Sequence, residues 1–475
     1  MVHSRGLGRS SGPVLRLAAA SVITVLTACG GNGYGSAANN GPPLMPTVNV
    51  SVSPTTINAG QSATVTWSTT NAQTCTASGG WSGTPATSGT QTVTPTATGT
   101  VMFTLACTAP SGMGYAGGGG GSATGSASLT VTPQTQFVAK NLVTDTAGGG
   151  GATVDPNLVN PWGIVFGAGK PVWTSNNHSQ TSTLYDGNGV RTPAANPLVV
   201  QLPPDATNND FDPTGIVYNS STTDFAVTAG GKTGVALFIF DGEDGMIGGW
   251  APAVSTAVVA IAYTATDGAS YKGLAIANNG TANFLYAADF ANNKVDMFDK
   301  TFTKQPANGR FVDPTLPAGY APFGIQAIAN GPGGAAQIYV TYAKQGTGGD
   351  NASGAGLGLV DIYDANGTFV KHLIPTGGWL NAPWGLALAP ASWGTLSNAL
   401  LVGNFGDGKI NAFDPATGVF LGTLTTASGP FQSPGLWGIA FGNGAANQPT
   451  NTLYFAAGPN DEANGVYGRV DLPPM

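Results

Sequence analysis

Charged residues are scarce in this chain of 475 residues, in which Asp, Glu, Lys and Arg together make up 8%. The 16 basic residues are outnumbered by 23 acidic ones, and the formal net charge of −7 argues against nucleic acid as a partner. Long apolar stripes with a helical period are missing as well, whereas glycine occurs 72 times. This composition favours an all-β chain with many tight turns.

Histidine and cysteine are equally rare, at three residues each. No Gly-x-Ser-x-Gly nucleophile elbow, with the motif between a predicted strand and a helix, is evident, which leaves nucleophilic catalysis with little support. The glycine runs at 117–121 and 148–151 lack the strand–helix context of a nucleotide-binding loop. His178 lies in a polar turn and is the one plausible imidazole base, whereas His372 belongs to a predicted outer strand and is expected at the surface. So few histidines disfavour a transition-metal site.

The N-terminus has the pattern of an export signal. Three arginines and no acidic residue come first, followed by an apolar run that ends at residue 28 and is too short to span a bilayer. The sequence Leu26-Thr27-Ala28-Cys29-Gly30 resembles the bacterial lipobox, which implies removal of 1–28, acylation of Cys29 and anchoring by lipid. Gly30 in place of Asp implies the outer membrane of the cell envelope. The alternative is an ordinary signal peptide cleaved at a small residue.

The next part of the chain is predicted to be a tether and a small β-sandwich. Residues 29–46 are rich in Gly, Asn, Ala and Pro and predict a flexible tether. Within 47–133, apolar residues alternate with polar ones in several short runs, a pattern typical of sandwich strands. Cys75 and Cys107 are an even pair in an exported segment, which predicts a disulfide; the alternative is two buried thiols. The runs 59–68 and 75–83 resemble bacterial immunoglobulin-like modules, which usually act as spacers or weak binders.

A repeat organises the remaining residues, 135–475. An apolar phrase centred on glycine returns roughly every 50–60 residues, and each copy continues through a second strand, a polar turn and further strands. Four antiparallel strands per radially repeated unit form the blade of a β-propeller. The six copies therefore predict a six-bladed propeller. The repeated glycines are Gly163, Gly215, Gly273, Gly324, Gly385 and Gly438.

The two ends of the repeat predict how the ring closes. The sixth copy stops at Met475 without a fourth strand, and residues 137–143 look like the fourth strand of another copy. Pairing of this early segment with the last blade gives circular closure, which leaves no unpaired edge in the ring.

Two resemblances support this architecture. Residues 288–299 are similar to the NHL repeat of six-bladed propellers. The whole of 135–475 resembles a family of exported bacterial propellers with no assigned activity, on the phrases 141–145 and 155–163 and on the six blade starts. The resemblance implies the fold and no particular function.

Candidate site residues gather where the blade starts and the polar turns meet at one mouth of the central channel. An aromatic rim there is expected to stack on a sugar or another flat apolar face, while polar groups orient it. The alternative is that the aromatics wedge between blades and that the turn residues bond local backbone. The predicted rim residues are Trp162, Thr214, Lys272, Phe323, Trp384 and Trp437 from the starts, and His178, Asp289, Asn293, Lys344, Asn404, Asp407, Asp461 and Glu462 from the turns.

A cation in the channel is a second expectation. Lactonases of the gluconolactonase type hold a divalent ion in this place with acidic and Asn ligands, and Ca²⁺ prefers such oxygen donors. Asp289, Asn404 and Glu462 or Asp461 are the candidate ligands in this chain. No blade start carries the acidic residue that the lactonases use.

The leading hypothesis is a monomeric envelope lipoprotein whose propeller binds an extracellular glycan, peptide or protein at the mouth. A long insert at 343–356 is predicted on the same face, either as a binding element or as a hairpin tip. The alternatives are a metal-assisted hydrolase or lactonase, and a structural surface protein without a ligand site.

Overall fold

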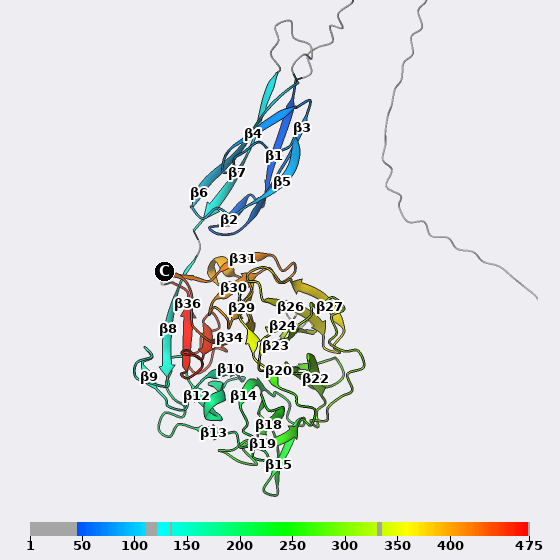
Figure 1. Cartoon of the computed structure of the whole chain (residues 1–475). Helices are drawn as coiled ribbons and strands as arrows, with labels where there is room; N and C mark the ends of the chain where they lie inside the picture. Colours follow the sequence, from blue (N-terminus) through cyan, green and yellow to red (C-terminus); the bar gives the residue numbers. More distant parts are fainter. Residues whose placement is uncertain (1–44, 111–120, 134, 330–334, 474–475) are drawn as a thin grey trace, which may run out of the picture.

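A computed structural model describes residues 45–110, 121–133, 135–329 and 335–473 (Figure 1). The predicted signal peptide 1–28, Cys29 and nearly all of the tether 29–46 lie outside the described residues. The described part of the chain consists of strands, turns and two short 3₁₀ helices, η1 (Asn177–Ser179) and η2 (Gly394–Leu396), so the all-β prediction is confirmed. None of its helices is long and apolar enough to cross a bilayer.

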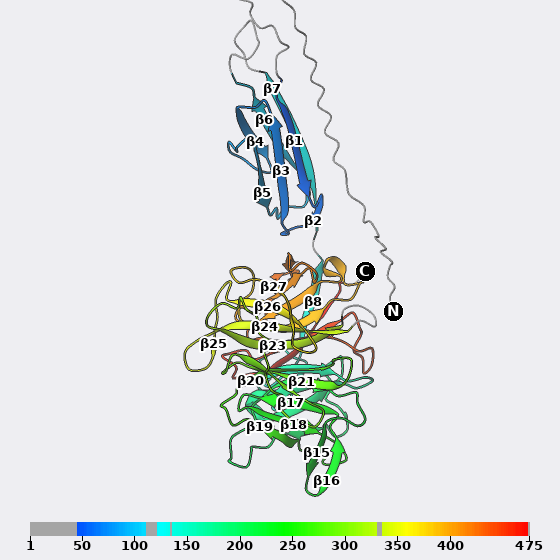
Figure 2. The same ribbon diagram turned by 90° about the vertical axis from the view of Figure 1, so that its right-hand side faces the viewer.

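The N-terminal region is a two-sheet sandwich that lies above the rest of the molecule in Figures 1 and 2. One sheet has the order β1-β3-β5 and the other β2-β7-β6-β4. Their facing side chains, among them Trp67, Trp81 and Phe103, form one buried core. The bounds are β1 (Thr47–Ser53), β2 (Thr56–Asn58), β3 (Ala63–Thr70), β4 (Thr74–Gly79), β5 (Ser88–Val93), β6 (Gly99–Thr108) and β7 (Ser122–Thr132).

A disulfide joins Cys75 on β4 to Cys107 on β6, as predicted. The two cysteines face each other across the strand pair, and both are buried in the sandwich core. The alternative of two free thiols is therefore wrong.

The second region is a β-propeller in which the described strands form six large sheets around one centre (Figure 1). Sheets 1 to 3 follow one another along the chain. Sheet 1 consists of β10 (Pro161–Phe166), β11 (Val172–Asn176), β12 (Thr181–Tyr185) and β13 (Val199–Gln201). Sheet 2 consists of β14 (Pro213–Tyr218), β17 (Phe238–Gly242), β18 (Met246–Trp250) and β19 (Ala260–Thr264). Sheet 3 consists of β20 (Tyr271–Asn278), β21 (Asn283–Asp289) and β22 (Lys294–Phe298). A small hairpin, β15 (Ala226–Ala229) with β16 (Lys232–Val235), projects beside sheet 2.

Sheets 4 to 6 complete the region. Sheet 4 consists of β23 (Tyr320–Ala329), β24 (Ala336–Gln345), β25 (Asn351–Ala352), β26 (Gly358–Asp364) and β27 (Phe369–Ile374). Sheet 5 consists of β28 (Pro383–Leu388), β29 (Leu400–Asn404), β30 (Ile410–Phe413) and β31 (Phe420–Thr423). Sheet 6 consists of β34 (Leu436–Phe441), β35 (Leu453–Ala457), β36 (Val466–Asp471) and β8 (Gln136–Thr144). Three short strands, β9 (Thr153–Val154), β32 (Thr425–Thr426) and β33 (Gly429–Pro430), extend sheet 6 along β8.

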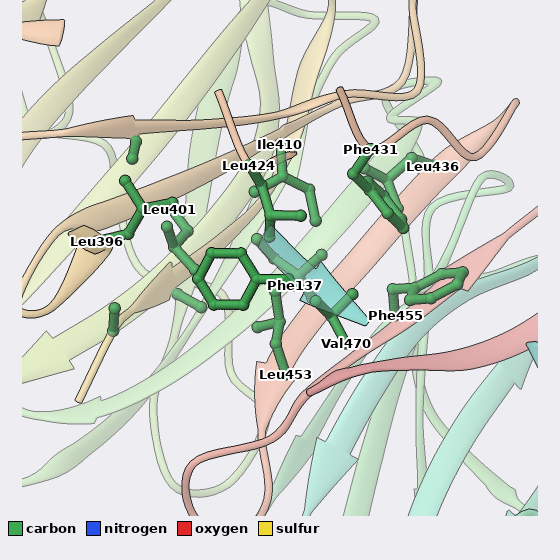
Figure 3. Packing of buried hydrophobic residues seen from close by; sticks show 14 of the residues in the cluster. Phe137, Leu396, Leu401, Ile410, Leu424, Phe431, Leu436, Leu453, Phe455 and Val470 are labelled. Carbon is green, nitrogen blue, oxygen red and sulfur yellow. The ribbon is translucent and has the colours of Figure 1, made fainter. Parts of the chain in front are cut away.

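Sheet 6 combines the two ends of this region. β8 pairs antiparallel with β36 from Val466↔Thr144 to Asp471↔Val138. Figure 3 shows Phe137 at the start of β8 among side chains of sheets 5 and 6. Its ring centroid lies 4.3 Å from that of Trp393, and both rings are buried. The segment predicted to supply a missing strand therefore lies beside the last strand of the chain and contributes to its core.

The six repeated glycines allow the innermost strands to approach one another closely. A Cβ atom on Gly163 would lie 2.7 Å from the carbonyl oxygen of Thr214 in sheet 2, and one on Gly438 would lie 2.6 Å from that of Trp162 in sheet 1. Each of the other four glycines likewise meets the backbone of the next sheet. The innermost strands contact one another in chain order, and β34 contacts β10.

The same end of all six sheets forms one opening of the central channel, here called the mouth. Pairs such as Pro161↔Asn176 and Pro383↔Asn404 place the start of an innermost strand beside the end of its neighbour. The register then shifts over the next three residues in every sheet, which is a β-bulge at the repeated glycine. Bulges re-aim side chains, and here they lie at the positions that the sequence marked as the rim.

Candidate functional site

Four aromatic side chains meet at the mouth: Trp162, Phe323, Trp384 and Trp437, here called the aromatic plug. Trp162 and Trp437 stack with ring centroids 3.5 Å apart, and Trp384 lies edge-on to both. Trp162, Phe323 and Trp437 are at most 2% exposed, whereas Trp384 is half-buried. The close approach of the innermost strands places the rings on one another, so that three of the four present no face to solvent.

Hydrogen bonds connect the plug to the polar side chains around it. The indole N–H of Trp384 donates to the Lys272 carbonyl at 2.6 Å, and that of Trp437 donates to Asn160 Oδ1 at 3.0 Å. Lys272 Nζ lies 5.4 Å from the Trp162 ring centroid, within range of a cation–π interaction. The plug therefore fixes the positions of Lys272 and Asn160.

Five side chains continue from these contacts as one polar network: Asn160, Asn177, Glu243, Lys272 and Glu462. Lys272 Nζ pairs with Glu243 Oε1, and Asn177 Nδ2 donates to Glu243 Oε2 at 3.0 Å. Asn160 Nδ2 donates to Asn177 Oδ1 at 3.5 Å and to Glu462 Oε2 at 2.6 Å. The network links sheets 1, 2, 3 and 6 across the mouth.

Sequence reasoning found two members of this network and missed three. Lys272 and Glu462 were predicted at the mouth, whereas Asn160, Asn177 and Glu243 were not. Glu243 follows β17, at the position equivalent to the turns that supplied the other polar candidates. The same expectation, that the polar turn after the second strand of each copy lies at the mouth, would have found Glu243 if it had been applied to sheet 2. Asn160 directly precedes the first blade start, and the prediction for that start named only its aromatic residue, Trp162.

The surroundings of the network are acidic. Burial raises the pKa of Glu462, and the charge of Glu243 adds to this effect while the Asn160 hydrogen bond opposes it. Burial also raises the pKa of Asp212, with a further contribution from Glu243, and raises that of Asp244 to about 6 with help from Asp212 and Glu243. Carboxylates that raise one another's pKa create a region that favours positive charge and hydrogen-bond donors.

A cavity of about 630 Å³ lies beside the plug. Glu462, Asp461 and Asp407 contribute carboxylates to its wall, and Phe405 contributes an aromatic ring. Ser353, from the predicted insert, also lines it. In the insert, β25 pairs back on the end of β24 and forms a hairpin extension. The cavity is large enough for a small ligand or for one residue of a longer one.

The remaining predicted turn residues serve the local backbone or stay at the surface. Asp289 accepts hydrogen bonds from the backbone N–H groups of Ser270 and Asn292, which is the alternative that turn chemistry offered. Asn293 has a left-handed φ of 51° in the same turn. His178 lies exposed on η1. The Lys344 ammonium lies 6.0 Å from the Tyr320 ring centroid.

Three other predicted residues differ in how their polar atoms are used. Asn404 donates to the Trp379 carbonyl at 3.0 Å, and its Oδ1 is buried without a partner among the described residues. Asp407 pairs with Lys409 at 3.2 Å while it lines the cavity. Thr214 is buried, with its hydroxyl 2.9 Å from Asp241 Oδ1.

No trio of acidic, cysteine or imidazole side chains among the described residues combines Asp289 with Glu462 or Asp461. Among the described residues, two groups of three acidic or imidazole side chains have ligand atoms within 4.8 Å of one another, and neither contains Glu462. Asp289 belongs to the group with Asp267 and Asp296. Lys294 lies within ion-pair distance of all three carboxylates, so this group already has a counter-charge. No observation here favours the metal-assisted hydrolase.

His372 differs from its prediction. It lies on β27 as an outer-strand residue, yet its side chain is only 27% exposed, and its Nδ1 lies 2.7 Å from Asp361 Oδ1. The loop before β23 covers the strand on this side with a second carboxylate, that of Asp313. A sequence pattern within one hairpin contains no sign of such a distant loop.

A comparison with known protein sequences gives relatives of the chain, whereas no family model matches it. "Uncharacterized protein R648" of Acanthamoeba polyphaga mimivirus is 32% identical over 329 residues, which are 67% of this chain and 76% of that protein. "Uncharacterized protein L690" of the same virus is 30% identical over 333 residues, 67% and 82% of the two chains.

Solved structures overlap with the chain only loosely. Virginiamycin B lyase from Staphylococcus aureus has a TM-score of 0.39 at 15% identity, over 71% of this chain and all of that one. An auxiliary nutrient binding protein from Bacteroides ovatus has a TM-score of 0.36 at 10% identity, over 91% and 99% of the two chains. Scores this low support no inference about function.

Proposed function

We propose that this chain, which belongs to the same family as the two mimivirus proteins, is a six-bladed propeller that binds an extracellular ligand at its mouth. The six blades are the six sheets, and circular closure is the pairing of β8 with β36. The cycle of glycine contacts, from Gly163 against Thr214 to Gly438 against Trp162, supports a closed ring.

The polar network carries the assignment of the ligand site. Lys272 is 5% exposed, and Asn160 and Asn177 are at most 1% exposed, yet they lead without a break to Glu462 at the cavity. Buried polar side chains satisfied by one another hold a fixed arrangement. Glu462 and its acidic neighbours then offer acceptors in that fixed position, which suits the hydroxyl and amino groups of a glycan or the amino groups of a peptide. The ligand contacts the acidic wall of the cavity, and the aromatic plug forms its rigid support.

The location is the cell envelope. The arginine-containing segment, the short apolar run and the Cys29 sequence support export and lipid attachment. The sandwich, with its disulfide, suits an oxidising compartment and acts as an immunoglobulin-like spacer between lipid and propeller. The chain acts as a monomer in this arrangement.

Binding panels test this function. Glycan and peptide arrays probed with the purified protein identify ligands, and the affinity of the best ones is then compared between the wild type, Glu462→Gln and Glu243→Gln. Loss of a charged hydrogen-bond acceptor costs about 1.5–3 kcal/mol, which is a loss of affinity of roughly tenfold or more.

Asp414→Asn is the matched control. Asp414 holds a local turn between β30 and β31, where it accepts hydrogen bonds from the backbone of Ala416 and Thr417, and it lies outside the cavity wall. The control is expected to bind like the wild type. Binding that survives both glutamate substitutions would show that the mouth is not the site, and panels without any ligand would contradict the binding function.

A further inference from the structure

Sheet 4 carries a second cluster of titratable side chains: Asp313, Asp361 and His372. Asp361 and His372 lie directly opposite each other on β26 and β27, and Asp313 lies on the loop that precedes β23. His372 Nδ1 is 2.7 Å from Asp361 Oδ1 and 3.6 Å from Asp313 Oδ2. β26 and β27 are the outer strands of their sheet, so the cluster is separate from the channel mouth (Figure 1).

The carboxyl group of Asp313 has one oxygen that is held and one that is free. The backbone N–H and the hydroxyl of Thr315 both lie 2.7 Å from Asp313 Oδ1. Oδ2 is buried, has no hydrogen-bond partner among the described residues and faces the imidazole. A buried, unpaired carboxylate oxygen costs a protein free energy unless a cation or a donor satisfies it.

The cluster is also short of positive charge. The side chains of Asp313 and Asp361 are fully buried, and within the described ranges His372 is the only basic residue in ion-pair distance of either. Burial raises the pKa of Asp361, His372 opposes this rise by its charge and its hydrogen bond, and the charge of Asp313 adds to it. The Asp267 group differs, because Lys294 and Lys304 contact it. Two buried carboxylates and an imidazole thus face one another without a fixed counter-charge.

We propose that Asp313, Asp361 and His372 bind a divalent transition-metal ion of the Zn²⁺ class. One imidazole nitrogen and two carboxylate oxygens are a donor set that Zn²⁺ accepts. Ligand atoms around a tetrahedral Zn²⁺ with bonds of roughly 2.0–2.1 Å are about 3.4 Å apart, close to the Nδ1–Asp313 Oδ2 separation. Binding requires the His372 proton on Nε2 and a small outward movement of Asp361 Oδ1.

Further side chains around the cluster hold these ligands in place. Thr315 orients Asp313, and the Tyr363 hydroxyl lies 3.4 Å from Asp361 Oδ2 and 2.7 Å from the hydroxyl of Tyr342. Such outer contacts orient metal ligands in most metalloproteins. The His372 side chain is 27% exposed, so the ion would enter from the imidazole side, and a water would serve as the fourth ligand. The ion would tie the loop before β23 to the outer hairpin of sheet 4.

Titration of the purified, chelator-treated protein with Zn²⁺ and with Co²⁺ tests the site. Calorimetry is expected to show one Zn²⁺ per chain at the site, and Co²⁺ is expected to give the visible absorption of a tetrahedral ion. His372→Gln and Asp313→Asn are expected to weaken binding by about 100-fold or more, and Thr315→Val by about tenfold, because outer-shell contacts contribute roughly 10- to 100-fold. Asp267→Asn, in the lysine-neutralised group, is the matched control and is expected to leave both signals unchanged.

The outcomes are separable from those of the ligand test at the mouth, because no residue is shared. Circular dichroism verifies that each variant is folded, and the conservative Thr315→Val variant provides a reading if either ligand variant does not fold. A wild-type protein that binds no Zn²⁺, or binding that is unchanged in His372→Gln, Asp313→Asn and Thr315→Val, would overturn the proposal.

Discussion

Replacing Gly438 with alanine tests whether the repeated glycines are required for space. A Cβ atom at this position would lie 2.6 Å from the Trp162 carbonyl oxygen and 3.1 Å from the Ile164 backbone nitrogen, both in sheet 1. Real Cβ atoms do not approach backbone so closely, so one sheet must shift. Gly273 is the natural comparison, because the nearest atom to its Cβ would be the Phe323 carbonyl oxygen at 3.1 Å.

The expected magnitudes follow from two opposing effects. Neither glycine has a positive φ, so alanine fits the backbone conformation and gains about 0.4–1 kcal/mol by restricting the unfolded chain. Overpacking in a closely packed interior costs about 1–3 kcal/mol. Gly438→Ala is therefore expected to lower the free energy of unfolding by roughly 1–2 kcal/mol, and Gly273→Ala to stay within about 1 kcal/mol of the wild type.

Urea unfolding followed by near-UV circular dichroism measures both variants. Gly438 connects the last sheet to the first, so its variant also reports on the contact at which the ring would close. If Gly438→Ala were as stable as Gly273→Ala, the close approach of sheets 6 and 1 would not matter, and the spatial reason given for the glycine repeat would fail.

Three further predictions concern other parts of the molecule. Replacing Cys75 and Cys107 by alanine is expected to lower sandwich stability by about 3–4 kcal/mol in a calorimetric melt, from a sequence separation of 32, and a loss below about 1 kcal/mol would contradict this. Burial raises the pKa of Asp241 to about 7, so the neutral form favours the folded state; the associated stability is complete below about pH 4 and is lost as the pH rises through 7. The free energy of unfolding of Asp241→Asn, relative to that of the wild type, is therefore expected to rise by roughly 2–3 kcal/mol from pH 5 to pH 8. If the variant and the wild type differed by the same amount at both pH values, the raised pKa of Asp241 would be refuted. Trp437→Phe keeps an aromatic ring but removes the donor to Asn160 Oδ1, and is expected to cost about 1–3 kcal/mol in urea unfolding, against about 3–5 kcal/mol for Trp437→Ala; a Trp437→Phe variant as stable as the wild type would show that the hydrogen bond contributes little.

The periodic features of the chain could be predicted from its sequence. Alternating apolar residues and the spacing of the glycine phrases depend on local rules, and they led to the all-β class and the propeller. The two cysteines led to the disulfide. The strand supplied by 137–143 was recognisable because its residues resemble an outer strand of another repeat, and it does pair with the last strand.

The character of the site was harder to predict, because it depends on distances between sheets. The sequence placed four aromatics near one another but contained no measure of the channel width, and a narrow channel turns a stacking rim into a plug. Asn160 and Glu462 contact each other from positions 302 residues apart, and Asp313 meets His372 from a loop outside its hairpin. Such contacts follow from the assembled fold and leave no local pattern.

The pairing of β8 with β36 also has a mechanical consequence. β8 receives the chain from the sandwich, so a pull transmitted through the N-terminal part of the protein acts along the axis of this strand. The hydrogen bonds of an antiparallel pair lie across the strands, and a pull along one strand loads all of them together in shear. Peeling would break them one after another under a smaller force. The strand that joins the two ends of the propeller is therefore also the one that would bear tension between the sandwich and the ligand proposed to bind at the mouth.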